Sequence, residues 1–174
     1  MIPFVTVPEN SKTLIQLHFM IKTALITGAT SGIGKATAKL LAQNNFKIVL
    51  CGRRKDRLEA LEKELSAFTA VHHLCFDVRD KKAVFESIAS LPEAFSDIDI
   101  LVNNAGNAHG LDSIQNGDMD DWDAMIDINV KGLLYVSKAI IPKMIAKESG
   151  HIINIGSIAG KEVYPNGNVY CASK

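Results

Sequence analysis

Residues 23–42, which read TALITGATSGIGKATAKLLA, decide the fold. The apolar and β-branched run from Thr23 to Thr27 is typical of a buried strand, and the apolar residues from Ile33 to Ala42 recur at helical spacing. Glycine stands at positions 28, 32 and 34 of the turn between them. A strand that passes through a glycine-rich turn into a helix predicts the first half of a β-α-β unit.

The same alternation continues along the chain. Four more apolar runs predict strands, at 47–51, 71–76, 98–102 and 151–155. Apolar residues at helical spacing predict further helices at 58–65, 83–88 and 130–145. Parallel strands joined by right-handed helical crossovers are the short way to connect such a series. The predicted fold class is therefore α/β, with a doubly wound parallel sheet covered on both faces.

Local signals mark the ends of several helices. Asn44 and Asn45 predict the end of the first helix, and Pro142 predicts a kink or a local break in the long one. Three acids, Asp118, Asp120 and Asp121, open another helical segment, where negative charge complements the positive helix end. A metal cluster is the alternative, and it is disfavoured because no His or Cys lies at ligand spacing among them.

Composition limits the function classes. A chain of 174 residues is the size of one domain, and its 19 basic and 19 acidic residues give no net charge. This balance disfavours nucleic acid and anionic membranes as partners. The three cysteines are widely spaced, without a Cys-x-x-Cys pair, so we expect neither a zinc cluster nor a disulfide framework, and a cytoplasmic location is the simplest.

The N-terminal region carries no convincing export signal or membrane span, because its most apolar stretch, 14–21, is short and contains Gln16 and His18. We expect residues 1–19 to form an irregular arm, or to precede the natural start at Met20, with the dinucleotide-binding domain at 20–174.

The glycine turn has a chemical interpretation. A dinucleotide pyrophosphate must approach backbone N–H groups at the start of a helix, where side chains would block it. The alternative is a tight turn with a packing glycine; a P-loop is excluded because no Gly-Lys-Ser/Thr follows. The residues expected to contact the cofactor here are Thr27, Gly28, Ser31, Gly32, Ile33 and Gly34.

The end of the second predicted strand favours NADP over NAD. An NAD site places an acid there for the ribose 2′-hydroxyl, whereas an NADP site places a basic residue near the 2′-phosphate. Here Arg53 and Arg54 follow Gly52, and no carboxylate occurs before Asp56. The alternative is that the two arginines only solvate a helix start, a position that suits cations poorly.

Three further motifs complete a pattern. Asn103-Asn104-Ala105-Gly106 follows the fourth predicted strand, Ser157 follows the fifth, and Tyr170-Cys-Ala-Ser-Lys174 ends the chain. With the glycine turn, they make the sequence from residue 20 onward resemble the short-chain dehydrogenases/reductases. The runs DIDILVNNAG, GHIINIGSIAG and GNVYCASK most resemble NADP-dependent 3-hydroxy acid, serine and allo-threonine dehydrogenases. The resemblance implies a Rossmann-type fold and hydride transfer between NADP and a small hydroxy acid or β-hydroxy amino acid.

The residue types suit that chemistry. Oxidation of an alcohol needs a group that exchanges the hydroxyl proton, and an ordinary phenol holds its proton too tightly at neutral pH. Lys174, four residues after Tyr170 on a helix, would favour the phenolate, and Ser157 would hold the substrate oxygen. The resemblance adds that Lys174 contacts the nicotinamide ribose and that Asn129 positions a proton-relay water. The plainer alternatives are a helix-start aromatic, a turn residue and a cap.

Other cofactor contacts follow from the resemblance alone. Asp77 and Val78 match its adenine-contacting pair, and Asn103, Ala105 and Gly106 match the stretch that passes the cofactor. His109 and the loop 163–165 either line a substrate pocket or are ordinary loop residues.

Members of this family continue beyond the position of Lys174, through two more strands and a substrate loop. We therefore expect a fold that is incomplete at its C-terminus and a 174-residue chain that turns over poorly. A truncated, non-catalytic dinucleotide-binding module is the alternative function. For the longer parent, the resemblance implies a homotetramer.

Overall fold

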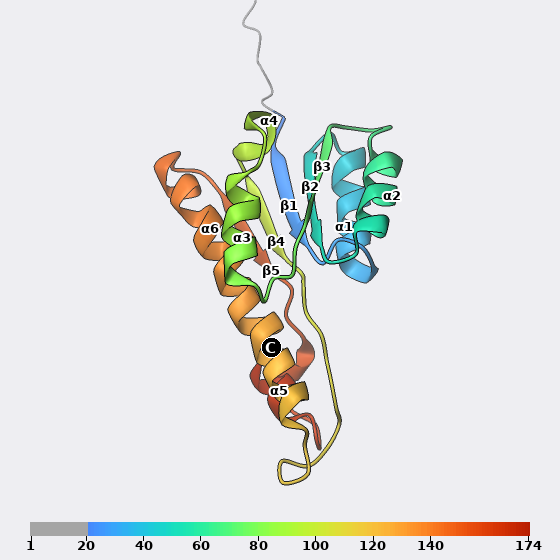
Figure 1. Cartoon of the computed structure of the whole chain (residues 1–174), viewed down its shortest axis with the longest axis vertical. Coiled ribbons are helices and arrows are strands. Elements are labelled where there is room, and N and C mark those ends of the chain that lie inside the picture. The colour runs from blue at the N-terminus through green and yellow to red at the C-terminus, as the bar shows by residue number, and fades with distance from the viewer. Residues whose placement is uncertain (1–20) are drawn as a thin grey trace, which may run out of the picture.

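Strand β1 (Thr23–Thr27) lies at the centre of a five-stranded parallel sheet with the order β3-β2-β1-β4-β5. The computed structural model describes residues 21–174, so the expected arm at 1–19 lies outside the described residues. The other strands are β2 (Lys47–Gly52), β3 (Val71–Cys75), β4 (Ile100–Asn103) and β5 (His151–Asn154) (Figure 1). The predicted doubly wound α/β fold is confirmed, and β1 has the predicted bounds.

The two faces of the sheet are covered by different helices. Because successive side chains of a strand point to opposite faces, neighbouring residues of β1 pack against different helices. Ala24 and Ile26 pack in one core with α1 (Gly32–Gln43) and α2 (Lys55–Leu65). Leu25 packs in the other with α3 (Lys81–Ala89) and α6 (Leu133–Ala146). All three strand residues are fully buried. This explains why β1 is apolar throughout instead of alternating.

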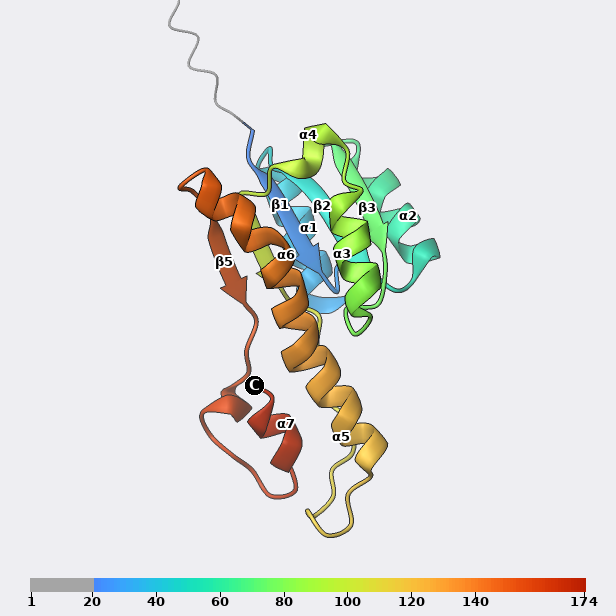
Figure 2. The same cartoon turned by 60° about the vertical axis from the view of Figure 1, so that its left-hand side comes forward.

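The remaining elements are short. They are α4 (Glu93–Ser96), α5 (Met119–Ile126), a π-helical turn η1 (Asp127–Gly132), a 3-10 turn η2 (Ile158–Gly160) and α7 (Asn168–Ala172). Figure 2 shows α5 and α6 as one continuous rod that extends past the sheet, with α7 beside its α5 end. Elements as short as α4 and η2 complete too few turns to show helical periodicity, so the sequence pattern did not reveal them.

The long helix differs from its prediction in two respects. The rod begins at Met119, eleven residues before the predicted start at Val130, and its irregular turn is η1. The predicted break at Pro142 does not occur, since α6 continues to Ala146. Pro142 and Lys138, whose carbonyl would have received the missing N–H, are both exposed, so water can satisfy that carbonyl.

Other predicted boundaries are confirmed. Asn45 takes the left-handed conformation, with φ of 64°, just after α1 ends. Asp118 caps α5 by accepting a hydrogen bond of 2.8 Å from the amide of Asp120. Within residues 21–174, no helix is both long and apolar enough to cross a membrane.

Candidate functional site

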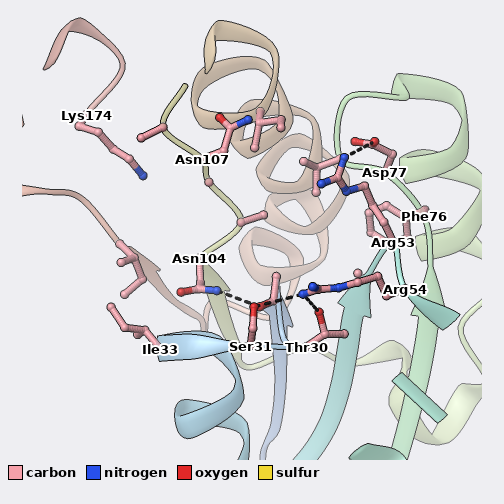
Figure 3. Close-up of a pocket in the computed structure, with 18 of the residues that line it drawn as sticks. Thr30, Ser31, Ile33, Arg53, Arg54, Phe76, Asp77, Asn104, Asn107 and Lys174 are labelled. Carbon is pink, nitrogen blue, oxygen red and sulfur yellow. Dashed lines mark hydrogen bonds and ion pairs between the residues drawn. The ribbon is translucent and has the colours of Figure 1, made fainter. Parts of the chain in front are cut away.

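The candidate site is a cleft of about 530 Å³ at the carboxyl ends of the strands, lined by residues that follow β1, β2, β3, β4 and β5 (Figure 3). The chain order reverses at β1, since β2 lies on one side of it and β4 on the other. Open α/β sheets bind ligands at such a reversal, because the loops after the two strands diverge there. The volume lies within the range of small-molecule sites.

The three glycines of the turn have different roles. Gly28 and Gly32 both have positive φ, 63° and 52°. A Cβ on Gly28 would lie 2.9 Å from Nδ2 of Asn104, and one on Gly34 would overlap the carbonyl oxygen of Gly28, so these two allow close packing. A Cβ on Gly32 would meet no atom within 4 Å. The geometry is therefore compatible with both interpretations of the turn: Gly28 and Gly34 allow close packing, and Gly32 leaves the helix start open.

Thr27 and Asn104 join the turn to the end of β4. The Thr27 hydroxyl accepts hydrogen bonds of 3.0 Å from the amides of both Asn104 and Ala105. Nδ2 of Asn104 in return donates to the carbonyls of Thr27 (2.9 Å) and Gly28 (3.2 Å). Thr27 is buried and does not line the cleft, so its side chain holds the turn in place. Asn104 is not among the predicted cofactor-binding residues, although it lies inside the quoted Asn-Asn-Ala-Gly motif.

Two arginines form one wall of the cleft. Nη2 of Arg54 donates to the hydroxyls of Thr30 (2.7 Å) and Ser31 (3.2 Å), as Figure 3 shows. Nη1 of Arg53 lies 3.4 Å from a carboxylate oxygen of Asp77, which follows β3. The predicted phosphate-binding arginines therefore do face the cleft, and both keep donors that a phosphate could use.

Asp77 is held mainly by Arg79. The Nε and Nη2 atoms of Arg79 lie 2.8 to 3.2 Å from the two carboxylate oxygens of Asp77. Partial burial opposes ionisation of Asp77, but the hydrogen bonds and charge of Arg79, with the charge of Arg53, outweigh it and lower the pKa of Asp77. Asp77 is therefore a carboxylate at neutral pH, oriented at the cleft wall.

Tyr170 and Lys174 form part of the opposite wall. Tyr170 lies on α7, and Nζ of Lys174 is 6.0 Å from the centre of the Tyr170 ring. A Cβ on Gly106 would lie 2.7 Å from that Nζ, so the glycine leaves room for the ammonium group. In Figure 3 Lys174 extends into the cleft from the side opposite Arg53 and Arg54. The predicted pair is thus brought together at the cleft.

Asn129 lies in the π-helical turn η1 behind the cleft, buried and fully bonded. Its Oδ1 accepts from the Asn107 amide (2.9 Å), and its Nδ2 donates to the Asn107 carbonyl (2.9 Å) and to the Ser173 hydroxyl (2.8 Å). Ser173 donates in turn to the carbonyl of Tyr170 (2.9 Å). The Asn129 side chain therefore joins the loop after β4 to the helix that carries Tyr170.

Two other predicted residues also lie outside the lining. Ser157 caps η2 by accepting from the Ala159 amide at 3.2 Å. Asn103 is buried, and its Nδ2 donates to Ser137 (3.0 Å) and to the side-chain oxygen of Asn154 (2.9 Å), which joins α6, β4 and β5. These contacts position the strand ends around the cleft.

Most of the predicted cofactor residues do line the cleft: Gly28, Ser31, Ile33, Arg53, Arg54, Asp77, Val78, Ala105, Gly106, Tyr170 and Lys174. Thr27, Gly32, Gly34, Asn103, Asn129 and Ser157 do not. The lining residues that the sequence reasoning missed are Thr30, Gly52, Phe76, Asn104, Asn107, Ala108, Ile128, Ile155 and Gly156. Nearly all of them adjoin a predicted residue, so sequence proximity was the available signal.

The loop residues considered for a substrate pocket lie outside this cleft. His109 lines a separate, much smaller pocket of about 10 Å³ with Tyr170, and its Nδ1 is 3.7 Å from an Asp121 carboxylate oxygen. Val163 is 82% exposed, and the Tyr164 ring packs against Gly167.

Comparison with known proteins agrees with this arrangement. Residues 22–174 match the short chain dehydrogenase family. The chain belongs to this family. This assignment agrees with the glycine turn, the parallel sheet and the Tyr170–Lys174 pair described above.

Several relatives are closely similar in sequence. The chain is 47% identical over 150 residues to the NADP-dependent 3-hydroxy acid dehydrogenase YdfG of Salmonella typhi, covering 86% of this chain and 60% of that protein. It is also 47% identical over 156 residues to sulfoacetaldehyde reductase 2 of Chromohalobacter salexigens, covering 89% and 62%. The chain thus spans about three fifths of the length of these curated relatives.

Among solved structures, the chain resembles a closed form of serine dehydrogenase complexed with NADP+, with a TM-score of 0.82 and 45% identity over 87% of this chain and 60% of that one. It resembles NAD+-bound xylitol dehydrogenase with a TM-score of 0.84 and 34% identity, over 88% and 59%. The backbone likeness alone therefore does not discriminate between the two nicotinamide cofactors.

Proposed function

We propose that this chain is the cofactor-binding part of an NADP-dependent oxidoreductase that interconverts an alcohol and a carbonyl. The observation that supports this most is one cleft with Arg53 and Arg54 on one wall and Tyr170 and Lys174 on the other. The YdfG relative is an NADP-dependent dehydrogenase and the similar serine dehydrogenase structure is a complex with NADP+, which agrees with this proposal.

The residues present fit a phosphorylated dinucleotide. Gly32 leaves open space at the start of α1, a helix end that carries partial positive charge and free N–H groups. Arg54 is already oriented by Thr30 and Ser31, and the sequence carries no acid between the end of β2 and Asp56. Gly28, Ser31, Gly32, Ile33, Arg53, Arg54, Asp77, Val78, Ala105, Gly106, Tyr170 and Lys174 are the proposed cofactor-binding residues, with Thr27, Gly34 and Asn103 acting through the backbone they hold.

Bound NADP would supply or accept the hydride. Tyr170 is the proposed acid or base that exchanges the hydroxyl proton of the substrate. The ammonium group of Lys174, 6.0 Å from the Tyr170 ring centre, would favour the charged form of that phenol. Ser157 would donate to the substrate oxygen, since its hydroxyl accepts from the Ala159 amide and keeps its own proton to donate. Asn129 keeps the loop after β4 in register with α7 through Asn107 and Ser173.

The proposed substrates are small 3-hydroxy acids or β-hydroxy amino acids, as the names of the YdfG and serine dehydrogenase relatives suggest. The test is titration of the chain with NADP+, NADPH and NADH, followed by NADPH absorbance with a panel of such acids. We expect tighter binding of NADPH than of NADH by the chain. In the full-length parent, Tyr170→Phe should abolish turnover and leave NADPH binding nearly unchanged. Turnover by that variant would contradict the proposed role of Tyr170.

Dinucleotide binding without turnover is the second candidate. The position of Ser157 favours it, because the residue that would hold the substrate oxygen is not among those that line the cleft. Measurable NADPH binding with no oxidation of any substrate in the panel would select this alternative.

We further propose a homotetramer for the full-length parent and a reducing, cytoplasmic setting. Leu134 and Ile145 on α6 are 56% and 70% exposed, which suits an interface with another copy, and the three cysteines are free. Light scattering of the purified protein distinguishes monomer, dimer and tetramer.

A further inference from the structure

All four arginines of the chain, at positions 53, 54, 57 and 79, lie between the end of β2 and the start of α3. Arg53 and Arg54 line the cleft, whereas Arg79 stands behind Asp77 and does not. Nothing in the proposed chemistry requires Arg79, yet its guanidinium makes the best-formed ion pair at this end of the sheet.

Arg53 and Arg79 compete for one carboxylate. Arg53 reaches the Oδ2 atom of Asp77 at 3.4 Å, a long contact. Arg79 reaches the same oxygen at 2.8 Å through Nη2 and at 3.1 Å through Nε, and its backbone amide donates to Oδ1 at 3.0 Å. Because Arg79 meets most of the bonding capacity of Asp77, Arg53 is only loosely held and can turn to another anion.

The position of Arg79 is fixed by the backbone around it. Its amide closes a turn on Asp77, and the next residue, Asp80, caps α3 by accepting from the Ala83 amide at 3.0 Å. The negative charge of Asp127 also attracts Arg79, but the Asp127 carboxylate is already paired with Nζ of Lys131 at 2.7 Å. Arg79 is therefore directed at Asp77 whatever the cleft contains.

We propose that Arg79 is a positioning residue for NADP selectivity: it neutralises Asp77, so that Arg53 is free to bind the 2′-phosphate. This inference rests on the proposed cofactor. A 2′-phosphate carries between one and two negative charges at neutral pH, so an unneutralised carboxylate beside Arg53 would repel it and would also hold the guanidinium that should bind it. A cofactor without the 2′-phosphate would not be affected.

The test measures the adenosine half of the cofactor alone, so it does not depend on turnover. The 174-residue chain is titrated calorimetrically with adenosine 2′,5′-bisphosphate and with AMP, in wild type and in Arg79→Gln. We expect Arg79→Gln to weaken bisphosphate binding about tenfold, or about 1.4 kcal/mol, with AMP binding changed less than about twofold. A purely structural role would weaken both ligands equally, and that result would overturn the proposal.

Two further variants sharpen the result. Adding Asp77→Asn to Arg79→Gln removes the acid that needs neutralising, so the ratio of the two affinities should return to within about twofold of wild type. Arg57→Gln removes the same charge from α2 without touching Asp77 and should leave the ratio within about twofold. A loss of selectivity in Arg57→Gln equal to that in Arg79→Gln would overturn the proposal, because it would indicate a general field effect.

Circular dichroism checks that Arg79→Gln is folded. If it is not, Arg79→Lys replaces it, since lysine keeps the charge and loses only the forked geometry, and the ratio should fall by about threefold or less. A wild-type chain that binds both ligands equally would refute the NADP preference itself, and this inference with it. A wild-type preference that persists unchanged in Arg79→Gln and Arg79→Lys would refute this inference alone.

Discussion

Replacing Thr27 by Val should cost this protein a large fraction of its stability, although the two side chains have nearly the same shape. The Thr27 hydroxyl is the acceptor for two backbone amides, those of Asn104 and Ala105, each at 3.0 Å. Valine keeps the volume and leaves both amides without this acceptor. Both amides lie where the loop after β4 passes the end of β1, and Asn104 and Ala105 line the cleft, so the substitution should also disturb the cleft.

The expected size follows from those two hydrogen bonds. Removing one partner of a buried amide costs about 1–3 kcal/mol, and both residues are partly buried, so the lower part of that range applies. The sum is about 2–4 kcal/mol, against a total stability of about 5–15 kcal/mol for an ordinary domain. With a urea m-value of about 2 kcal/mol/M, the middle of the usual range, the unfolding midpoint should fall by about 1–2 M.

Urea unfolding followed by circular dichroism measures this, with two control variants. Thr23→Val is the same change on the same strand at an equally buried position, where the hydroxyl accepts from neither loop amide. Thr27→Ser keeps the acceptor and removes only a methyl group. Both controls should lose about 1 kcal/mol or less. If Thr27→Val is no less stable than Thr23→Val, the two amides find other partners and the reasoning is wrong.

Three other changes test different parts of the structure. Gly28→Ala should destabilise the chain by about 1–2 kcal/mol and weaken NADPH binding, because its φ is 63° and a Cβ would press on the loop after β4; equal binding in calorimetry would contradict this. Burial opposes the charge on Lys147, but the hydrogen bonds that its ammonium group donates to Asp97 and Asp99, with their negative charges, outweigh it and raise the pKa of Lys147. The ion pairs of Lys147 therefore stabilise the fold fully below the ordinary lysine pKa of about 10.4, and this contribution is lost as the pH rises through the raised pKa. The difference in urea midpoint between wild type and Lys147→Met should stay constant between about pH 6 and 9 and shrink above about pH 10.4. Ser173→Ala should lower the thermal midpoint by a few degrees, since it removes a hydroxyl that both accepts and donates a buried bond, and an unchanged scan would count against that linkage.

Much of the fold could be predicted because its signals are local. The run 23–27, the turn at 28–34 and the helical period after it each involve residues adjacent in sequence, and β1 has its predicted bounds. The errors occur where neighbours in space decide. The rod that contains α5 and α6 begins at Met119 through a π-helical turn, and Pro142 does not interrupt it, since the affected face is open to water.

The same distinction between local signals and neighbours in space applies to the candidate site. The amino-acid sequence by itself determined the order of motifs: a glycine turn, two arginines where an NAD site would have an acid, and a tyrosine four residues before a lysine. Only the tertiary structure decided which of these face the cleft and which hold it in shape. Thr27, Asn103 and Asn129 carry side chains whose hydrogen bonds are taken by residues 22 to 78 positions away, and Arg79 bonds Asp77 from behind the wall. A buried polar group must find a partner wherever the fold places one, and sequence spacing does not contain that information.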